Sequence, residues 1–108
     1  MPRSRPARTP APLFAALGDD TRLKVISRLS HEGPLPIVRL TEGTTLSRQA
    51  ITKHLRVLED AGIVESTRNG RESIWQLRPK RLSDARRFIE AISNEWEARI
   101  ERLRAFVE

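Results

Sequence analysis

Residues 47–61 gather side chains that bond readily to nucleotides on one side of a predicted helix. At 3.6 residues per turn, amide, hydroxyl and cationic groups align on this side, whereas apolar groups align on the other. Glutamine pairs well with adenine, lysine and arginine pair with guanine, and hydroxyls and arginines hold phosphates. This chemistry fits the major groove of DNA. We call this side the polar face; its members are Ser47, Arg48, Gln49, Thr52, Lys53 and Arg56.

Two kinds of contact are expected from the polar face. Ser47 and Arg56 should hold phosphates, which fix the register of a protein on DNA without reading its sequence. The other members should reach base edges, although the pairing of each residue with a particular base stays open. An ordinary solvated helix surface is the alternative. The expected base contacts are Gln49, Thr52 and Lys53, with Arg48 beside them.

The charges of this helix oppose its dipole, which is partly positive at the N-terminus and favours acidic residues there. Arg48 stands in the first turn, and Glu59 and Asp60 stand in the last. Each exposed charge placed in this way costs on the order of 0.3–1 kcal/mol. A cation at the positive end is therefore expected to face a polyanion.

A hairpin is predicted next, over residues 63–77 around Asn69-Gly70. Asn-Gly between strand-like runs favours a tight turn in which both residues adopt positive φ. Arg68 and Arg71 flank the tip, and we expect them to enter a minor groove or touch phosphates. The alternative is a charged tip that only keeps the hairpin soluble. A DNA-reading helix followed by such a hairpin predicts a helix with a wing.

Three shorter helices are predicted ahead of the polar face. The first covers residues 13–17, the second follows a cap at Asp19 or Asp20, and the third begins at Pro36. Ser47 is a suitable N-cap for the helix that carries the polar face. A short helix, a turn and a second helix with long hydrogen-bond donors form a helix-turn-helix. The predicted fold is mainly α with a β-hairpin wing.

The last segment, residues 79–108, carries an apolar stripe at steps of three and four residues. A helix of about 26 residues is roughly 40 Å long, which exceeds what a domain of this size can cover. The expected partner of the stripe is the same helix of a second copy. The expected dimer contacts are Leu82, Ala85, Ile89, Ile92, Trp96, Ile100 and Leu103.

The whole chain of 108 residues suffices for one domain. It divides into a disordered basic tail (1–12), a winged helix-turn-helix core (13–78) and a dimerisation helix (79–108). The tail is either simply solvated or an arm that reaches a DNA groove.

The net charge of +6 favours nucleic acid, an anionic membrane surface or an acidic protein as the partner. The sequence has no cysteine, so it offers neither a disulfide nor a thiolate metal site. No apolar run approaches the roughly 18 residues that span a bilayer, and a soluble cytoplasmic protein without membrane partners is expected. Without a thiol, a glycine-rich phosphate loop or a metal-spaced histidine cluster, no enzyme activity is expected. His54 should be structural or touch a phosphate.

Three segments resemble the regulators of the arsenical-repressor (ArsR-like) family. Residues 14–23 read FAALGDDTRL and resemble the opening of that family. Residues 47–64 read SRQAITKHLRVLEDAGIV and resemble its recognition helix and exit. Residues 68–72 and 75–77, RNGRE and WQL, resemble its wing. The resemblance covers about residues 13–107.

This resemblance implies a homodimeric winged-helix repressor that binds an imperfect palindrome in double-stranded DNA. Many members of the family release DNA when they bind a metal. Here the cysteine pair of the third-helix metal site is missing, and no histidine lies beyond His54 for a last-helix site. The chain thus resembles the branch without metal sites, so no metal or cofactor is expected and the effector is unknown. A protein-interaction module, an RNA-binding module and an activator remain the alternatives.

Overall fold

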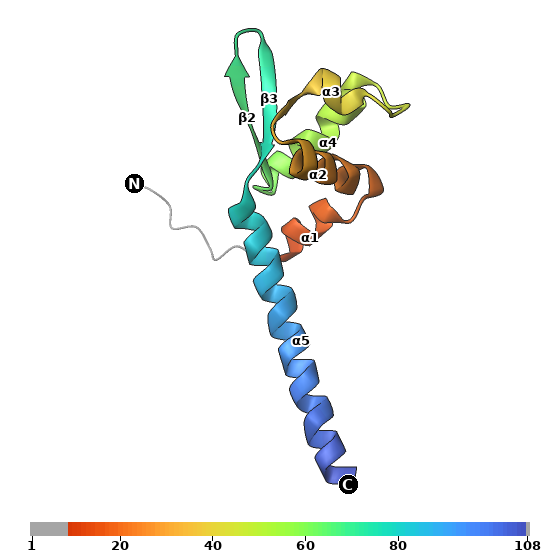
Figure 1. The fold of residues 1–108 in the computed structure, drawn as a ribbon, viewed down its shortest axis with the longest axis vertical. Helices are drawn as coiled ribbons and strands as arrows, with labels where there is room; N and C mark the ends of the chain where they lie inside the picture. Colours follow the sequence, from red (N-terminus) through yellow and green to blue (C-terminus); the bar gives the residue numbers. More distant parts are fainter. Residues whose placement is uncertain (1–8, 108) are drawn as a thin grey trace, which may run out of the picture.

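Five helices and three strands make up residues 9–107, the part of the chain that the computed structural model describes (Figure 1). The helices and hairpin form a body, and the last helix projects from it. This mainly helical fold with a hairpin wing was predicted from the sequence and is confirmed. In chain order the elements are α1 (Ala11–Leu17), α2 (Asp20–Glu32), β1 (Leu35–Pro36), α3 (Ile37–Thr41), α4 (Arg48–Asp60), β2 (Val64–Asn69), β3 (Glu72–Leu77) and α5 (Pro79–Val107).

Side-chain caps explain where the two middle helices begin. Asp19 accepts a hydrogen bond from the backbone N–H of Arg22 at 3.0 Å, so Asp19 rather than Asp20 caps α2. Ser47 accepts from the N–H of Ala50 at 3.1 Å and caps α4, as predicted. Each such cap contributes about 1 kcal/mol to stability. Pro36 is the N-cap residue of α3 and stands one position before its first turn.

The hydrophobic core joins all the elements of the body. Leu13 from α1, Leu40 from α3 and Leu55 from α4 are almost completely inaccessible to solvent. Burying a side chain of this size contributes roughly 1.5–3 kcal/mol. Trp75 on β3 is also buried, in keeping with a core role for this tryptophan. Buried side chains on one side of α4 leave its polar face directed outward.

The sheet has three antiparallel strands in the order β1-β3-β2. The sequence predicted only the hairpin. The additional strand, β1, has two residues: Leu35 pairs with Trp75, and Pro36 pairs with Ile74. Because Pro36 is also the N-cap residue of α3, this short strand attaches the helix-turn-helix to the wing.

The hairpin turn lies one residue further along than predicted. Asn69 pairs with Glu72, so the two connecting residues are Gly70 and Arg71. Gly70 has a φ of +66°, whereas Asn69 does not adopt a positive φ. The prediction that both Asn69 and Gly70 adopt positive φ is therefore wrong. A glycine at the first connecting position is instead typical of a type II′ turn, which suits the twist of a hairpin.

The start of α1 also corrects a predicted boundary. Ala11 begins the helix and Pro12 lies in its first turn, where proline is well tolerated, so the tail cannot extend to residue 12. The rest of the predicted tail, residues 1–8, lies outside the described part of the chain.

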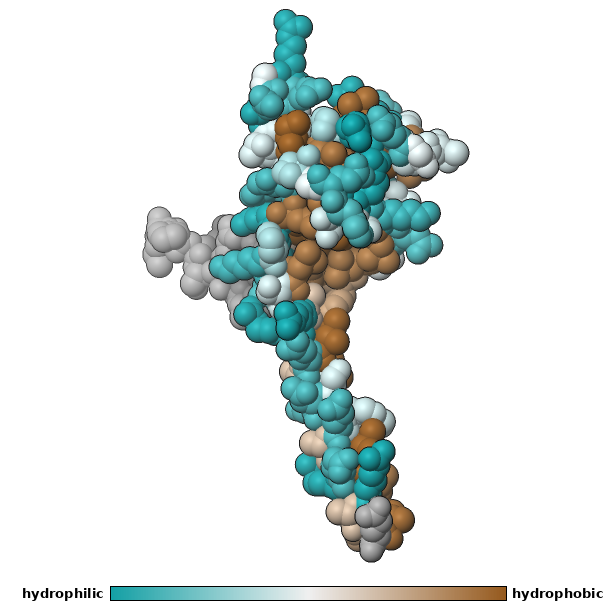
Figure 2. Space-filling view, in the orientation of Figure 1, coloured by the Kyte–Doolittle hydropathy of each residue, from teal (hydrophilic) through white to brown (hydrophobic). Residues whose placement is uncertain are grey.

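Only the beginning of α5 packs against the body. Leu82 and Ala85 contact the core, and the rings of Phe14 and Phe88 are 5.6 Å apart. Ala85 is only 6% exposed within its own chain, so its expected place in a partner interface is not retained. Beyond Phe88 the helix leaves the body, and Figure 2 shows hydrophobic side chains along one of its sides. The molecule therefore measures 65 Å along its longest axis.

Candidate nucleic-acid interface

The structure brings four members of the polar face together on the open side of α4. Arg48, Gln49, Thr52 and Lys53 line one shallow hollow. Three of them are exposed and Thr52 is half-buried. The opposite side of the helix buries Ile51, so the polar face is turned outward.

The hydroxyl groups of this surface are partly used within the helix. Ser47 Oγ accepts the capping hydrogen bond, which leaves its own hydrogen to be donated to a phosphate. Thr52 donates from Oγ1 to the carbonyl of Arg48 at 2.8 Å, which leaves lone pairs on Oγ1 to accept from a base amine. Within residues 9–107, neither Arg48 nor Lys53 forms an ion pair with an acidic side chain. Their charges are thus available to an anionic partner.

Arg56 stands apart from the other cations of the polar face. Its Nη1 bonds Glu59 Oε1 at 3.1 Å, and its guanidinium carbon lies 6.0 Å from the centre of the Trp75 ring. These contacts turn Arg56 toward the hairpin. Glu59 also neutralises part of the charge of Arg56, because residues three positions apart lie next to each other on a helix.

The wing presents two arginines at its tip. Arg68 pairs with Ser73 near the end of β2, and Arg71 lies in the turn itself; both are exposed. Figure 1 shows the hairpin extending from the body in the direction opposite to the C-terminus of α5. The two cations therefore lie far from the exposed half of α5.

Behind the polar face, Arg22 connects α4 to the helices before it. Its Nε donates to the carbonyl of Ala16 at 2.6 Å, and its Nη1 lies 3.2 Å from Nδ1 of His54. Asp19 Oδ2 is 3.8 Å from the same Nδ1. The backbone N–H of Arg22 holds the pKa of Asp19 below its ordinary value, which keeps this carboxylate charged. His54 was predicted to be structural or to touch a phosphate. Arg22 was not predicted from the sequence, although Asp19 and Arg22 both belong to the opening segment that resembles the family.

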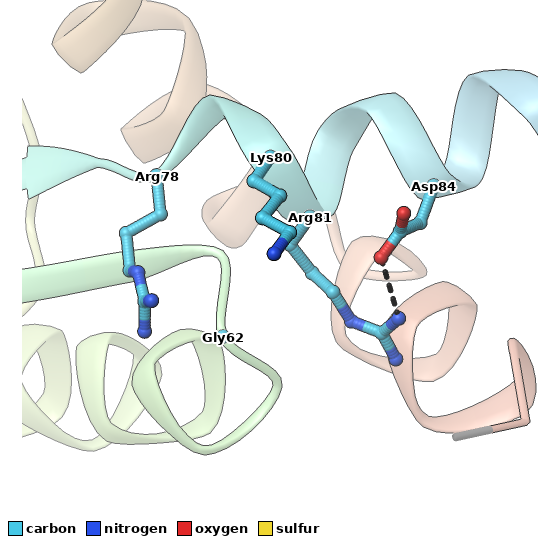
Figure 3. Close-up of a pocket in the computed structure, with 5 residues that line it drawn as sticks. All are labelled: Gly62, Arg78, Lys80, Arg81 and Asp84. Carbon is cyan, nitrogen blue, oxygen red and sulfur yellow. Dashed lines mark hydrogen bonds and ion pairs between the residues drawn. The ribbon is translucent and has the colours of Figure 1, made fainter. Parts of the chain in front are cut away.

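A basic hollow of about 280 Å³ lies where the hairpin passes into α5 (Figure 3). Arg81 crosses its floor: Nε donates to the carbonyl of Ala61 at 3.2 Å, and Nη1 contacts Asp84 at 3.1 Å. The hydrogen bond from Arg81 holds the pKa of Asp84 below its ordinary value, and Arg87 adds to this effect. Arg78 is 3.6 Å from Glu65. The hollow is thus mainly an anchorage of α5 on the end of α4.

Residues 9–107 contain no cluster of three or more metal-ligating side chains. None of the helices in this part of the chain combines the length and hydrophobicity that a membrane crossing needs.

The fold and the polar face define a winged helix-turn-helix protein of the DNA-binding class. A family model described as a helix-turn-helix domain matches residues 17–67. The chain belongs to the ArsR-like family of transcriptional regulators, as its sequence predicted. It is a regulator and not an enzyme.

Three relatives support the assignment of the chain to this family. The uncharacterized HTH-type transcriptional regulator YuzN of Bacillus subtilis is 45% identical over 65 residues, which are 55% of this chain and 71% of YuzN. The arsenical resistance operon repressor of Escherichia coli is 29% identical over 98 residues, which are 91% of this chain and 81% of that repressor. The structure of an ArsR-like transcriptional regulator from Rhodococcus sp. RHA1 superimposes with a TM-score of 0.78 at 35% identity and covers 91% of this chain and 92% of its own.

Proposed function

We propose that this protein is a homodimeric repressor that binds a palindromic operator in double-stranded DNA. Two copies of α4 would enter successive major grooves about one helical turn, or roughly 34 Å, apart. The observation that carries this proposal is the polar face itself: four nucleotide-bonding side chains share an open surface on a helix whose other side is buried.

The side chains of the polar face have different roles in recognition, because they differ in the hydrogen-bonding groups that they leave free. Gln49, Thr52 and Lys53 read base edges, with Arg48 beside them. Ser47 donates its remaining hydrogen to a phosphate. The remaining cations hold the backbone from the wing side; they are Arg56, Arg68 and Arg71.

The second copy binds along the exposed half of α5. Ile89 and Ile92 are each 52% exposed, and Trp96 is 64% exposed, although all three are large and apolar. An apolar stripe of this length marks an interaction surface rather than a solvated one. Leu82 supports the helix from within the body instead. The remaining contacts of the proposed interface are Ile100, Leu103 and Phe106.

Repression would follow from the position of such a dimer on the DNA. A protein on an operator that overlaps a promoter excludes polymerase, and one of the relatives bears the name of an operon repressor. An activator would use the same DNA contacts at a different place. Because the sequence has no cysteine, a signal that acts through metal thiolates has no ligand here.

The test is selection of the preferred duplex from a random 30-base-pair library, followed by binding measurements with that duplex. We expect a palindromic consensus, a steep loss of affinity with salt, and competition by duplex DNA but not by RNA. Equal binding to the selected and scrambled duplexes would exclude a sequence-specific regulator. Better competition by RNA would favour an RNA-binding module. A protein-interaction module would instead need an apolar patch where the polar face lies.

A further inference from the structure

Arg22 is the side chain that connects α4 to the junction between α1 and α2. It donates to the carbonyls of Ala16 at 2.6 Å and Ala15 at 3.3 Å, which lie at the C-terminal end of α1. The carbonyl of Ala15 also accepts from the backbone N–H of Gly18 at 3.2 Å, and a cation at the C-terminal end of a helix is favourable. The third contact of the same guanidinium is His54, in the middle of α4.

A hydrogen bond between Arg22 and His54 requires an unprotonated Nδ1 on the ring. A guanidinium can only donate hydrogen bonds, so Nδ1 of His54 must accept, and the ring proton lies on Nε2. A second proton on the ring would occupy Nδ1. The contact would then place two cations 3.2 Å apart, and Asp19 Oδ2, at 3.8 Å, would become the preferred partner of Nδ1.

The surroundings of His54 contain few other charges. The charged groups that face the ring from the α1–α2 junction are Arg22 and Asp19. On its own helix the adjacent charged residue is Lys53, which points into the hollow of the polar face. Among residues 9–107, no other acidic oxygen comes within 4.0 Å of a His54 nitrogen.

We propose that Arg22 is a positioning residue for DNA recognition: it holds α4 through neutral His54, and protonation of His54 releases that hold. This inference rests on the proposed function. Base reading requires that Lys53 and Gln49 be placed to within a fraction of an ångström, whereas general attraction to phosphates does not. Loss of the contact should therefore lower specific binding and spare non-specific binding.

The sign of the pH effect separates this proposal from a simple phosphate contact. Histidine is the side chain that ordinarily gains its charge between about pH 8 and pH 5. A histidine that merely touched phosphate would strengthen DNA binding as the pH falls. A histidine that must stay neutral to accept from Arg22 weakens specific binding over the same range.

The first experiment measures fluorescence anisotropy with the selected duplex and its scrambled counterpart at pH 7.5 and 5.5, at constant ionic strength. The specific-to-non-specific affinity ratio of the wild type should fall about tenfold, within the range typical of coupling between two sites, because Arg22 needs an unprotonated Nδ1 as its acceptor. His54→Asn keeps an acceptor near the position of Nδ1 but cannot be protonated, so its ratio should stay constant within about twofold. His31→Asn is the matched control, because His31 bonds the carbonyl of Ser27 within α2; it should behave as the wild type does.

The second experiment compares two arginines that bond helix-end carbonyls. Arg22→Lys keeps the charge but loses the forked geometry, so the specific affinity at pH 7.5 should fall about tenfold and the pH dependence should disappear. Arg28 donates to the carbonyls of Arg39 and Glu42, and within residues 9–107 it forms no hydrogen bond with a side chain of α4, so Arg28→Lys should keep the wild-type pH dependence. Circular dichroism and thermal unfolding establish that both variants fold.

Three outcomes would decide against the proposal or its basis. Equal pH dependence in the wild type and His54→Asn would overturn the role of His54. Equal losses of specificity in Arg22→Lys and Arg28→Lys, with unchanged pH dependence, would reduce Arg22 to a structural residue. In both cases specific binding at pH 7.5 would persist, and the proposed function would stand. Absence of any preference of the wild type for the selected duplex would instead reject the proposed function itself.

Discussion

Arg81 donates a hydrogen bond to the carbonyl of Ala61, and this bond joins the first turn of α5 to the residue that ends α4. The side chain of Arg81 is only 11% exposed, and its other end contacts Asp84. The recognition helix is thus held at its end by the helix that would carry the second copy.

Removing the guanidinium of Arg81 should destabilise the fold. Arg81→Met keeps much of the apolar stem but leaves a shielded carbonyl without its donor, which costs about 1–3 kcal/mol. Urea unfolding followed by circular dichroism measures the change. Arg86→Met is the control, because that side chain is exposed and, among residues 9–107, pairs only with Glu90; equal losses in both variants would contradict an anchoring role for Arg81.

Gln49 should contribute to the choice of base rather than to general affinity. Gln49→Ala is expected to reduce discrimination at one symmetric pair of operator positions by about 1–3 kcal/mol, because the amide can no longer form its paired bonds. Repeating the duplex selection with the variant would show relaxed preference at those positions. Ser30→Ala, on the exposed side of α2, should select the wild-type consensus. An unchanged consensus for Gln49→Ala would remove Gln49 from base reading.

The arginines at the tip of the wing should act through charge. Arg68→Ala and Arg71→Ala should each weaken binding to the selected and scrambled duplexes by similar factors. Each should also lower the slope of log affinity against log salt by about 1, as the loss of one phosphate contact predicts. Titrations at several salt concentrations measure that slope. A slope equal to that of the wild type would favour the alternative in which the tip only aids solubility.

Trp96 should report on the association of α5. Trp75→Phe would leave Trp96 as the one remaining tryptophan of the two in the chain. We expect its fluorescence to be blue-shifted and protected from acrylamide in the dimer, and red-shifted when the protein is diluted. Adding Trp96→Arg to the wild type should produce a monomer in sedimentation velocity at micromolar concentration. A dimer that survives this change would place the interface elsewhere.

Acid should destabilise the protein through its paired aspartates. The pKa of Asp84 is lowered by the hydrogen bond from Arg81, and the pKa of Asp19 is lowered by the N–H of Arg22. Because the folded state holds these carboxylates charged, their contribution is present above the ordinary aspartate range near about pH 4. It is lost as the pH falls from that range through the lower folded values. Between pH 6 and 2.5 the free energy of unfolding should therefore fall less steeply with decreasing pH for Asp84→Asn than for the wild type. An identical pH dependence of the two proteins would contradict the pairing.

The elements that could be predicted from the sequence are those in which local chemistry determines local structure. Ser47 identified the start of α4 because a hydroxyl at that position satisfies a free N–H. Gly70 marked the tip of the hairpin, although the turn itself lies one residue later than predicted. The apolar spacing after Pro79 identified α5 as one continuous helix.

Contacts between distant residues could not be predicted in this way. Strand β1 has only two residues and contains a proline, so neither alternation nor composition indicates it. The contact of Arg22 with His54 spans 32 positions of the chain and depends on how three helices pack. Arg81 and Ala61 are likewise 20 positions apart. Such pairs become visible only when the fold brings them together.

The unbroken course of α5 has a geometric consequence for the operator. If two copies associate along this helix, a slip of one helical turn moves one body relative to the other by about 5.4 Å, which is the rise of roughly one and a half base pairs of B-DNA. The number of base pairs between the two half-sites would then depend on the register in which the two copies of α5 associate.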